Sequence, residues 1–174
     1  IPWRAPDGSI WTLERRYAPR YGDEKPPRGG KYSQPDARHH QPPAAYPYGA
    51  DSPELSTAKE VWLVEGALDV LAVRALNDRG MLTPDGSRRP LVALGLPGVG
   101  AWPRVRSWVG QHVPGRTVRL ALDADAAGAA VVTAIAADCR QGGAASVRRK
   151  GPPEGFKDWA DVSAQELGLG GARS

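Results

Sequence analysis

Apolar and polar positions follow two different patterns along the chain, and the change comes near residue 57. Beyond it, short apolar runs alternate with longer segments whose apolar residues recur at helical spacing. The first run, 61–64, is continuously apolar, as is typical of a strand buried on both faces of a sheet. The predicted strands are 61–64, 91–94, 117–122 and 144–149. The predicted helices are 68–76, 102–109, 126–140 and 158–167. The first is predicted from the helical spacing of Leu68, Leu71, Ala72, Ala75 and Leu76, and it is expected to stop before Gly80.

This alternation of strands and helices predicts an α/β fold. Strands that alternate with helices form a mostly parallel sheet, because each helix carries the chain back across one face. We expect a four-stranded sheet flanked by helices over residues 57–170.

Residues 1–56 have a different character. They contain ten of the 17 prolines and few apolar residues beyond the first turn-flanked segments. Asp7-Gly8 is a turn pair that favours a β-hairpin between residues 1–4 and 9–16. We expect a small hairpin followed by a proline-rich basic loop that packs on something else.

Composition excludes several classes of protein. The 174 residues are 41% hydrophobic and 24% charged, the balance of a soluble globular protein. No apolar run reaches the roughly 20 residues that a membrane span needs. The single cysteine excludes a disulfide framework and a cysteine-built zinc site, and a reducing, cytoplasmic compartment is expected. The chain begins with Ile1 rather than Met, so it is interpreted as a piece of a longer protein.

Acidic residues gather where the predicted strands end. Ligands of an open parallel sheet bind outside the carboxyl ends of its strands. Carboxylates that meet there repel one another unless a cation neutralises them, and hard oxygen ligands on short turns suit Mg²⁺. Gly66 and Gly128 would leave room for a metal or a phosphate. The acidic residues are Glu65, Asp69, Asp123, Asp125, Asp158 and Asp161.

Each of these carboxylates has an alternative role as a helix cap. An acidic side chain at the start of a helix is favoured by the helix dipole. For Asp69 and Asp158 taken singly, capping is favoured over metal binding. For Glu65 and the Asp123/Asp125 pair, metal binding is favoured, because the pair repeats a carboxylate on one side of a single turn.

Two other motif readings fail on detail. A calcium loop that begins at Asp123 would need a ligand at Ala127 and a glutamate at Ala134. The glycines of 95–100 are not followed by the Gly-Lys-Ser/Thr of a phosphate-binding loop, so this stretch is interpreted as a strand-to-helix turn.

The arrangement resembles the Toprim domain, which bacterial DnaG-type primases, topoisomerases and some nucleases share. The resemblance rests on Val64–Asp69 and Leu122–Gly128, each after a predicted strand and before a helix, and on Lys157–Asp161. Within that superfamily, the Glu-Gly-x-x-Asp motif is similar to that of the primases, including phage and plasmid members. The segment upstream resembles the primase hairpin, and 31–35 resembles its Lys-Tyr element.

The resemblance implies a specific function. The chain would be the catalytic-core fragment of a DNA primase, a nucleotidyltransferase that makes short RNA primers on single-stranded DNA from ribonucleoside triphosphates. Two Mg²⁺ or Mn²⁺ ions, and no zinc, would bind the six carboxylates named above, with Glu65, Asp123 and Asp125 catalytic. Nucleotide or nucleic acid would contact Arg16, Lys31, Tyr32 and Lys157. A replicative helicase would bind through parts outside this fragment.

Two alternatives and two departures from the family pattern stay open. A Toprim nuclease would use Glu65 as a general base to hydrolyse the backbone, and a non-catalytic module would only bind nucleic acid or the replisome. The final acidic pair is spaced Asp-x-x-Asp instead of Asp-x-Asp, and the Lys-Tyr element is shortened. Residues 148–150, near Lys157, are interpreted as a solvated edge or as a track for a phosphate backbone.

Overall fold

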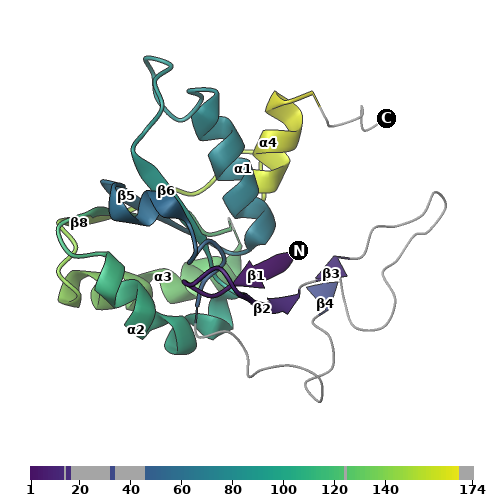
Figure 1. Cartoon of the computed structure of the whole chain (residues 1–174). Coiled ribbons are helices and arrows are strands. Elements are labelled where there is room, and N and C mark those ends of the chain that lie inside the picture. Colours follow the sequence, from purple (N-terminus) through teal and green to yellow (C-terminus); the bar gives the residue numbers. More distant parts are fainter. Residues whose placement is uncertain (14, 17–31, 34–45, 124, 169–174) are drawn as a thin grey trace.

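A computed structural model describes residues 1–13, 15–16, 32–33, 46–123 and 125–168. The predicted alternation of strands and helices is confirmed (Figure 1). The strands of the main domain are β5 (Glu60–Val64), β6 (Leu91–Gly95), β7 (Thr117–Leu120) and β8 (Ser146–Arg149). Its helices are α1 (Ala67–Asp78), α2 (Trp102–His112), α3 (Ala126–Gln141) and α4 (Trp159–Glu166), with short 3₁₀ turns η2 (Pro53–Ser56) and η3 (Val99–Ala101).

The four strands form one sheet in the order β6-β5-β7-β8, and every neighbouring pair is parallel. Successive residues of β5 therefore point to opposite faces. Val61 and Leu63 join the apolar cluster beneath α2 and α3, whereas Trp62 and Val64 join the cluster beneath α1 and α4. The result is a sheet covered by two helices on each face (Figure 1).

The strand order places a topological switch point between β5 and β7. From β5 the chain moves outward to β6 through α1, returns past β5 to β7 through α2, and moves outward again to β8 through α3. The segments that leave β5 and β7 thus diverge to opposite faces, which opens a crevice at the carboxyl ends of these two strands. Residues that directly follow β5 and β7 are therefore the best placed to meet a ligand.

The buried face of α1 differs from the apolar stripe predicted from the sequence. Leu71 is 45% exposed, although the helical spacing of leucines and alanines includes it. The stripe that packs on the sheet passes instead through Val70, Val73 and Leu76. The sheet surface beneath α1 is already filled by Trp62 and Ala93, and the valines complete this layer.

The predicted hairpin around Asp7-Gly8 is confirmed, and it is anchored by a tryptophan. Strands β1 (Pro2–Arg4) and β2 (Ile10–Leu13) pair antiparallel. Trp3 is 1% exposed and packs against Ala67, at the start of α1, and against Tyr48. Tyr48 in turn exchanges two backbone hydrogen bonds with Gly95, of 2.8 and 3.0 Å. The hairpin is therefore held beside the end of the sheet where α1 begins.

None of the helices within the described ranges is long and apolar enough to cross a membrane.

Gly95 is a position where the fold leaves too little room for a side chain, and a substitution tests this. A Cβ at Gly95 would lie 2.7 Å from the backbone oxygen of Gly66 and 3.1 Å from Val70. We expect Gly95→Ala to lower the free energy of unfolding by roughly 1–3 kcal/mol, as overpacking does in rigid surroundings. Gly100→Ala is the control, because a Cβ there meets nothing within 4 Å. Equal melting temperatures for the two variants would show that this contact does not constrain the fold.

Candidate functional site

The candidate site lies at the carboxyl ends of β5 and β7, at the topological switch point. Glu65 directly follows β5, and Asp123 follows β7 after two residues. Backbone hydrogen bonds continue past the strand ends, from Ala121 N–H to Leu63 and from Leu96 N–H to Val64, both 2.8 Å. These bonds extend the backbone pairing beyond the strand ends and so fix the positions of Glu65 and Asp123 at the edge of the sheet.

Glu65 carries the most unusual atom of the site. Its Oε1 is buried and has no hydrogen-bond partner within the described part of the chain. A Cβ at Gly128 would lie 3.0 Å from this oxygen and 2.6 Å from the backbone oxygen of Asp123. Only glycine therefore lets the first turn of α3 pack so closely on Glu65. A buried carboxylate oxygen without a donor costs free energy, which a cation would recover.

The backbone of Gly66 takes part in a close packing contact. A Cβ there would meet only Asp69 Oδ2, at an ordinary 3.9 Å. The tight approach involves the backbone of Gly66 instead, which lies against Gly95. The backbone of Gly66 therefore has a packing role on the neighbouring strand, and the expectation that a side chain at residue 66 would obstruct a ligand stays a prediction.

The carboxylates of the site raise one another's pKa. Burial, followed by the negative charges of Asp123 and Asp125, raises the pKa of Glu65 to about 7. Burial, followed by Asp123 and Asp158, raises the pKa of Asp69 to about 7. Asp123 acts on both, so it is the electrostatic centre of the cluster. Asp161 is not among the larger causes of either shift.

Asp69 joins two helices. It is 8% exposed and lies in the first turn of α1, whose N-cap is Gly66 rather than an acidic residue. Its Oδ1 accepts a hydrogen bond of 3.1 Å from the N–H of Ala160, in the first turn of α4. The cap expected for Asp69 is therefore made, but on a different helix, and it ties α4 to α1.

Asp125 and Asp158 are N-caps of the helices that follow them. Asp125 Oδ1 accepts from the Gly128 N–H at 2.9 Å, and Asp158 Oδ1 accepts from the Asp161 N–H at 2.8 Å. Capping was favoured for Asp158 and is present. Asp125, for which metal binding is predicted, is also the N-cap of α3 and uses its Oδ1 for this bond. These caps turn the two carboxylates toward their own helices.

Within the described ranges, no group of three or more His, Cys, Asp or Glu side chains is gathered closely enough to hold a metal ion. The donor set nevertheless suits a hard divalent cation. Glu65 Oε1 is buried and without a donor within the described residues, Asp123 and Asp125 act on Glu65 electrostatically, and Gly128 allows the first turn of α3 to approach it. The residues thus fit Mg²⁺ in chemistry, with side chains that are partly engaged as caps.

The basic residues predicted to bind nucleic acid are only partly described. Strands β3 (Arg15–Arg16) and β4 (Tyr32–Ser33) pair antiparallel, with Arg16 opposite Tyr32. Lys31 lies outside the described residues. Lys157 is exposed and immediately precedes Asp158. Backbone pairing thus brings together two residues that lie sixteen positions apart in the sequence.

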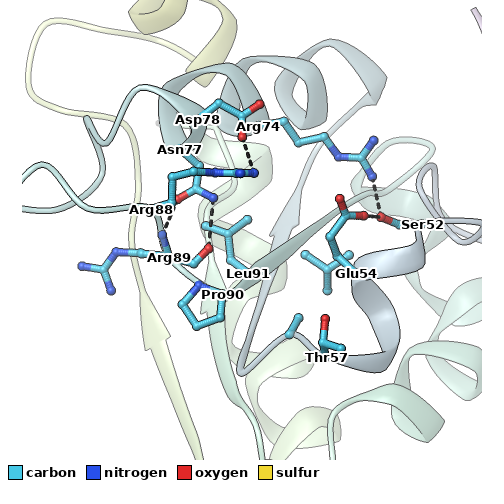
Figure 2. Close-up of a pocket in the computed structure, with 12 residues that line it drawn as sticks. Ser52, Glu54, Thr57, Arg74, Asn77, Asp78, Arg88, Arg89, Pro90 and Leu91 are labelled. Carbon is cyan, nitrogen blue, oxygen red and sulfur yellow. Dashed lines mark hydrogen bonds and ion pairs between the residues drawn. The ribbon is translucent and has the colours of Figure 1, made fainter.

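A second hollow lies near the amino end of β6, away from the carboxylates (Figure 2). It has a volume of about 240 Å³. Arg74 donates to Ser52 Oγ at 3.0 Å, and Arg88 pairs with Asp78 at 2.5 Å. None of the sequence-predicted site residues lines it, and its charges largely neutralise one another, so the polar contacts there are structural.

Sequence reasoning did not identify two groups that help to build the site. The N–H of Ala160 is a backbone group and leaves no trace in the sequence. Gly95 closes a predicted strand, and only its distance to Gly66 reveals why a glycine stands there. The place of Gly95 at the end of a predicted strand was the available signal.

The raised pKa values predict how stability depends on pH without divalent metal. The folded state binds protons at Glu65 and Asp69 more tightly than the unfolded chain, whose values are near 4.5 and 3.8. This contribution to stability is present below pH 4 and is lost as the pH rises to about 7.

Between pH 5 and 8, in EDTA, we expect the free energy of unfolding of Asp69→Asn to fall less steeply than that of the wild type. An asparagine keeps an acceptor for the Ala160 N–H but does not titrate. Urea unfolding at each pH measures this, with Glu154→Gln, at an exposed loop position, as the control. Parallel curves for wild type and Asp69→Asn would contradict the assignment.

Comparison with known proteins agrees with the fold. A search of curated proteins found no relative. A protein-family model described as Toprim-like matches residues 62–163, more than half of the chain. The matched region runs from β5 into α4 and includes Glu65, Asp123 and Asp158. This type of domain is that of metal-binding enzymes that act on nucleic acids. The chain belongs to the Toprim-like family.

Proposed function

We propose that this chain is the catalytic core of a DNA primase, a metal-dependent nucleotidyltransferase that joins ribonucleotides into short RNA primers on single-stranded DNA. The observation that carries the proposal is the buried Oε1 of Glu65, which faces Gly128 and has no donor within the described residues. It lies where the Toprim-like match and the topological switch point coincide. A buried anion in this place is suited to a cation and to the phosphates that the cation binds.

Glu65, Asp123 and Asp125 would hold Mg²⁺ or Mn²⁺, with two ions as the working hypothesis. Asp69, Asp158 and Asp161 would complete the acidic surroundings. A bound divalent ion supplies charge neutralisation at the phosphates and aligns the attacking 3′-hydroxyl with the leaving pyrophosphate. The chain's own contribution is to hold the carboxylates at one edge of a rigid sheet.

The supporting residues position the site. Gly128 admits the first turn of α3 against Glu65, and the Asp125 cap fixes where that turn begins. Asp69 holds α4 to α1, and thereby fixes Asp158 at the same edge. Phosphoryl transfer depends mainly on positioning and electrostatic stabilisation, so these contacts are the protein's share of the chemistry.

The N-terminal segments resemble those of primases, and for this reason synthesis is proposed ahead of hydrolysis. The hairpin is anchored by Trp3 against Ala67, beside the carboxyl edge of the sheet, and Arg16 pairs with Tyr32 in a second small ribbon. Arg16, Tyr32 and Lys31 would bind the triphosphate or the template–primer backbone. Lys157, just before α4, would contact the nucleic acid. A nuclease would need the same carboxylates, so the two activities are separated by assay.

Substitution of the acidic pair tests the chemistry. We expect Asp123→Asn and Asp125→Asn each to lower primer synthesis by roughly two orders of magnitude or more, because each removes a carboxylate that would hold the divalent ion. Asparagine is also a good N-cap, so Asp125→Asn should fold normally. The measurement is incorporation of labelled ribonucleotides on single-stranded DNA, beside nicking of supercoiled plasmid. Wild-type nicking without primer synthesis would replace the primase by a nuclease.

Thermal unfolding tests the metal site independently of activity. Like charges held together destabilise the metal-free protein, and an ion that binds only the folded state stabilises it by about 2.7 kcal/mol at a hundredfold excess over its Kd. We expect millimolar Mg²⁺ to raise the melting temperature of the wild type above its value in EDTA. Asp125→Asn should be at least as stable as the wild type in EDTA and gain much less from Mg²⁺. Identical wild-type melts in EDTA, Mg²⁺ and Mn²⁺ would leave the acids as helix caps only.

A further inference from the structure

The α1/α4 face of the sheet carries basic side chains on β7 and β8. Arg119 pairs in register with Trp62 on one side and with Arg148 on the other. The N–H of Lys150 donates to the Leu120 oxygen at 2.9 Å and so continues the register past β8. By strand alternation, Arg148 and Lys150 lie on the same face as Arg119, whereas Arg149, opposite the core residue Leu120, lies on the other. We name Arg89, Arg119, Arg148 and Lys150 the cationic strip.

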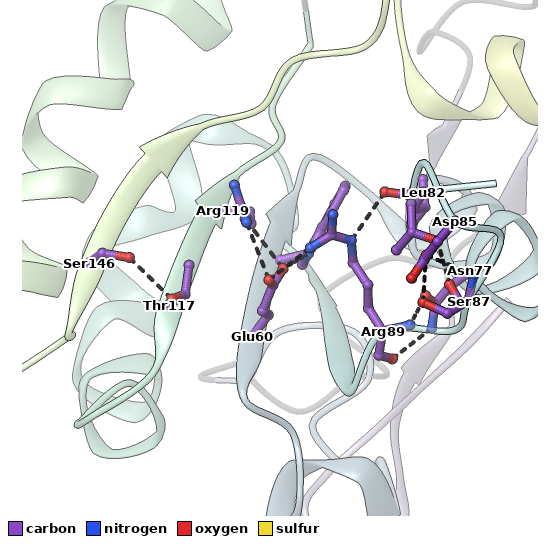
Figure 3. Close-up of polar contacts among 11 residues, drawn as sticks. Glu60, Asn77, Leu82, Asp85, Ser87, Arg89, Thr117, Arg119 and Ser146 are labelled. Atoms are coloured by element: carbon purple, nitrogen blue, oxygen red, sulfur yellow. Dashed lines mark hydrogen bonds and ion pairs between the residues drawn. The ribbon is translucent and has the colours of Figure 1, made fainter. Parts of the chain in front are cut away.

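The sheet is hollowed beside this strip. A cavity of about 410 Å³ is lined by Trp62, Arg89, Arg119 and Lys150, and by residues 81–84. Figure 3 shows Arg89 and Arg119 reaching toward Glu60 from opposite sides. Arg89 bonds to the Glu60 carboxylate at 3.0 Å, and Arg119 bonds to both of its oxygens at 3.2 Å. The two guanidinium groups are thus held in fixed positions.

The strip carries excess positive charge. Glu60 is a single carboxylate shared by two guanidinium groups. Arg148 and Lys150 are exposed, and no ion pair within the described residues involves either of them. Glu166 lines a neighbouring cavity together with Lys150, without forming an ion pair with it. The surface therefore favours an anionic ligand.

The position of the strip connects it to the candidate site. Lys150 lies at the carboxyl end of β8, next to the Leu120 oxygen, and Asp123 follows Leu120 by three residues. From there the strip runs back along β8 and β7, away from the carboxylates. A nucleic-acid strand bound at the carboxylate edge would meet the strip as it continues in this direction.

We propose that the cationic strip binds the phosphodiester backbone of the nucleic-acid strand that extends past the carboxylate edge. This inference rests on the proposed function. Trp62 and Trp159 are 1% and 2% exposed, so neither offers a ring face on which a base could stack. Contacts through Arg and Lys alone bind phosphates without reading sequence. The strip therefore strengthens binding uniformly for all sequences.

The test compares neighbouring substitutions on opposite faces of β8. Binding of a labelled single-stranded DNA is followed by fluorescence anisotropy over a range of NaCl concentrations, in EDTA. We expect Arg148→Ala and Lys150→Ala each to lower the slope of log K against log salt by about 0.7, the value for one lost phosphate contact on a single strand. Arg149→Ala is the matched control, because it removes an equal charge from the same exposed strand, and its slope should not change. Thermal melts establish that all three variants are folded.

Each other outcome decides against the strip. An equal change of slope in all three variants would mean that only net charge matters, and no change in Arg148→Ala and Lys150→Ala would remove the strip from DNA binding. If these two variants weaken binding of a polyglutamate peptide but not of DNA, the strip is a surface for an acidic protein.

Primer synthesis by the wild type is measured separately. Its absence together with the expected slopes would overturn the primase but keep the strip as a nucleic-acid contact. Primer synthesis by the wild type together with unchanged slopes in the Arg148→Ala and Lys150→Ala variants would keep the primase and remove the strip from nucleic-acid binding.

Discussion

The close packing of α3 on Glu65 is the interaction on which the candidate site depends. It is possible only because Gly128 has no side chain, and it leaves one carboxylate oxygen buried without a donor in the described structure. The same approach brings the charges of Asp123 and Asp125 to bear on Glu65 and raises its pKa to about 7, after burial as the larger cause. The fold thus holds an unfavourable concentration of negative charge at one edge, which a divalent cation would relieve.

Helix capping organises the rest of this edge. The side chains of Asp125 and Asp158 each satisfy an amide in the first turn of the following helix, and Asp69 satisfies one in a helix that is remote in sequence. These hydrogen bonds offset part of the repulsion between the carboxylates. They also oppose metal binding in part, since a carboxylate that turns toward its helix is turned away from a shared ion. Capping and ligation are therefore two uses of the same residues.

Acidic side chains at the two ends of the sheet differ in their ion-pair partners within the described residues. At the amino ends, Glu60 is matched with Arg89 and Arg119, and Asn77 exchanges hydrogen bonds of 2.8 and 3.1 Å with the Arg89 backbone. At the carboxyl ends, no basic side chain of the described residues forms an ion pair with Glu65. A scaffold that surrounds a carboxylate with basic side chains at one end of the sheet and gathers carboxylates at the other is suited to bind a cation where the strands end.

The sequence alone determined the α/β order, the hairpin turn at Asp7-Gly8 and the gathering of acids at strand ends. Each of these follows from local properties: continuous apolar runs, helical spacing, turn chemistry and the position of a motif after a strand. Tertiary structure decided which face of α1 is buried, because Leu71 competes with Val70 and Val73 for a sheet surface that the sequence does not display. It also decided that Asp69 caps α4 and that Gly95, rather than Gly66, is the crowded glycine. These outcomes depend on distances between segments far apart in the chain, and residue type and spacing along one segment carry no information about such distances.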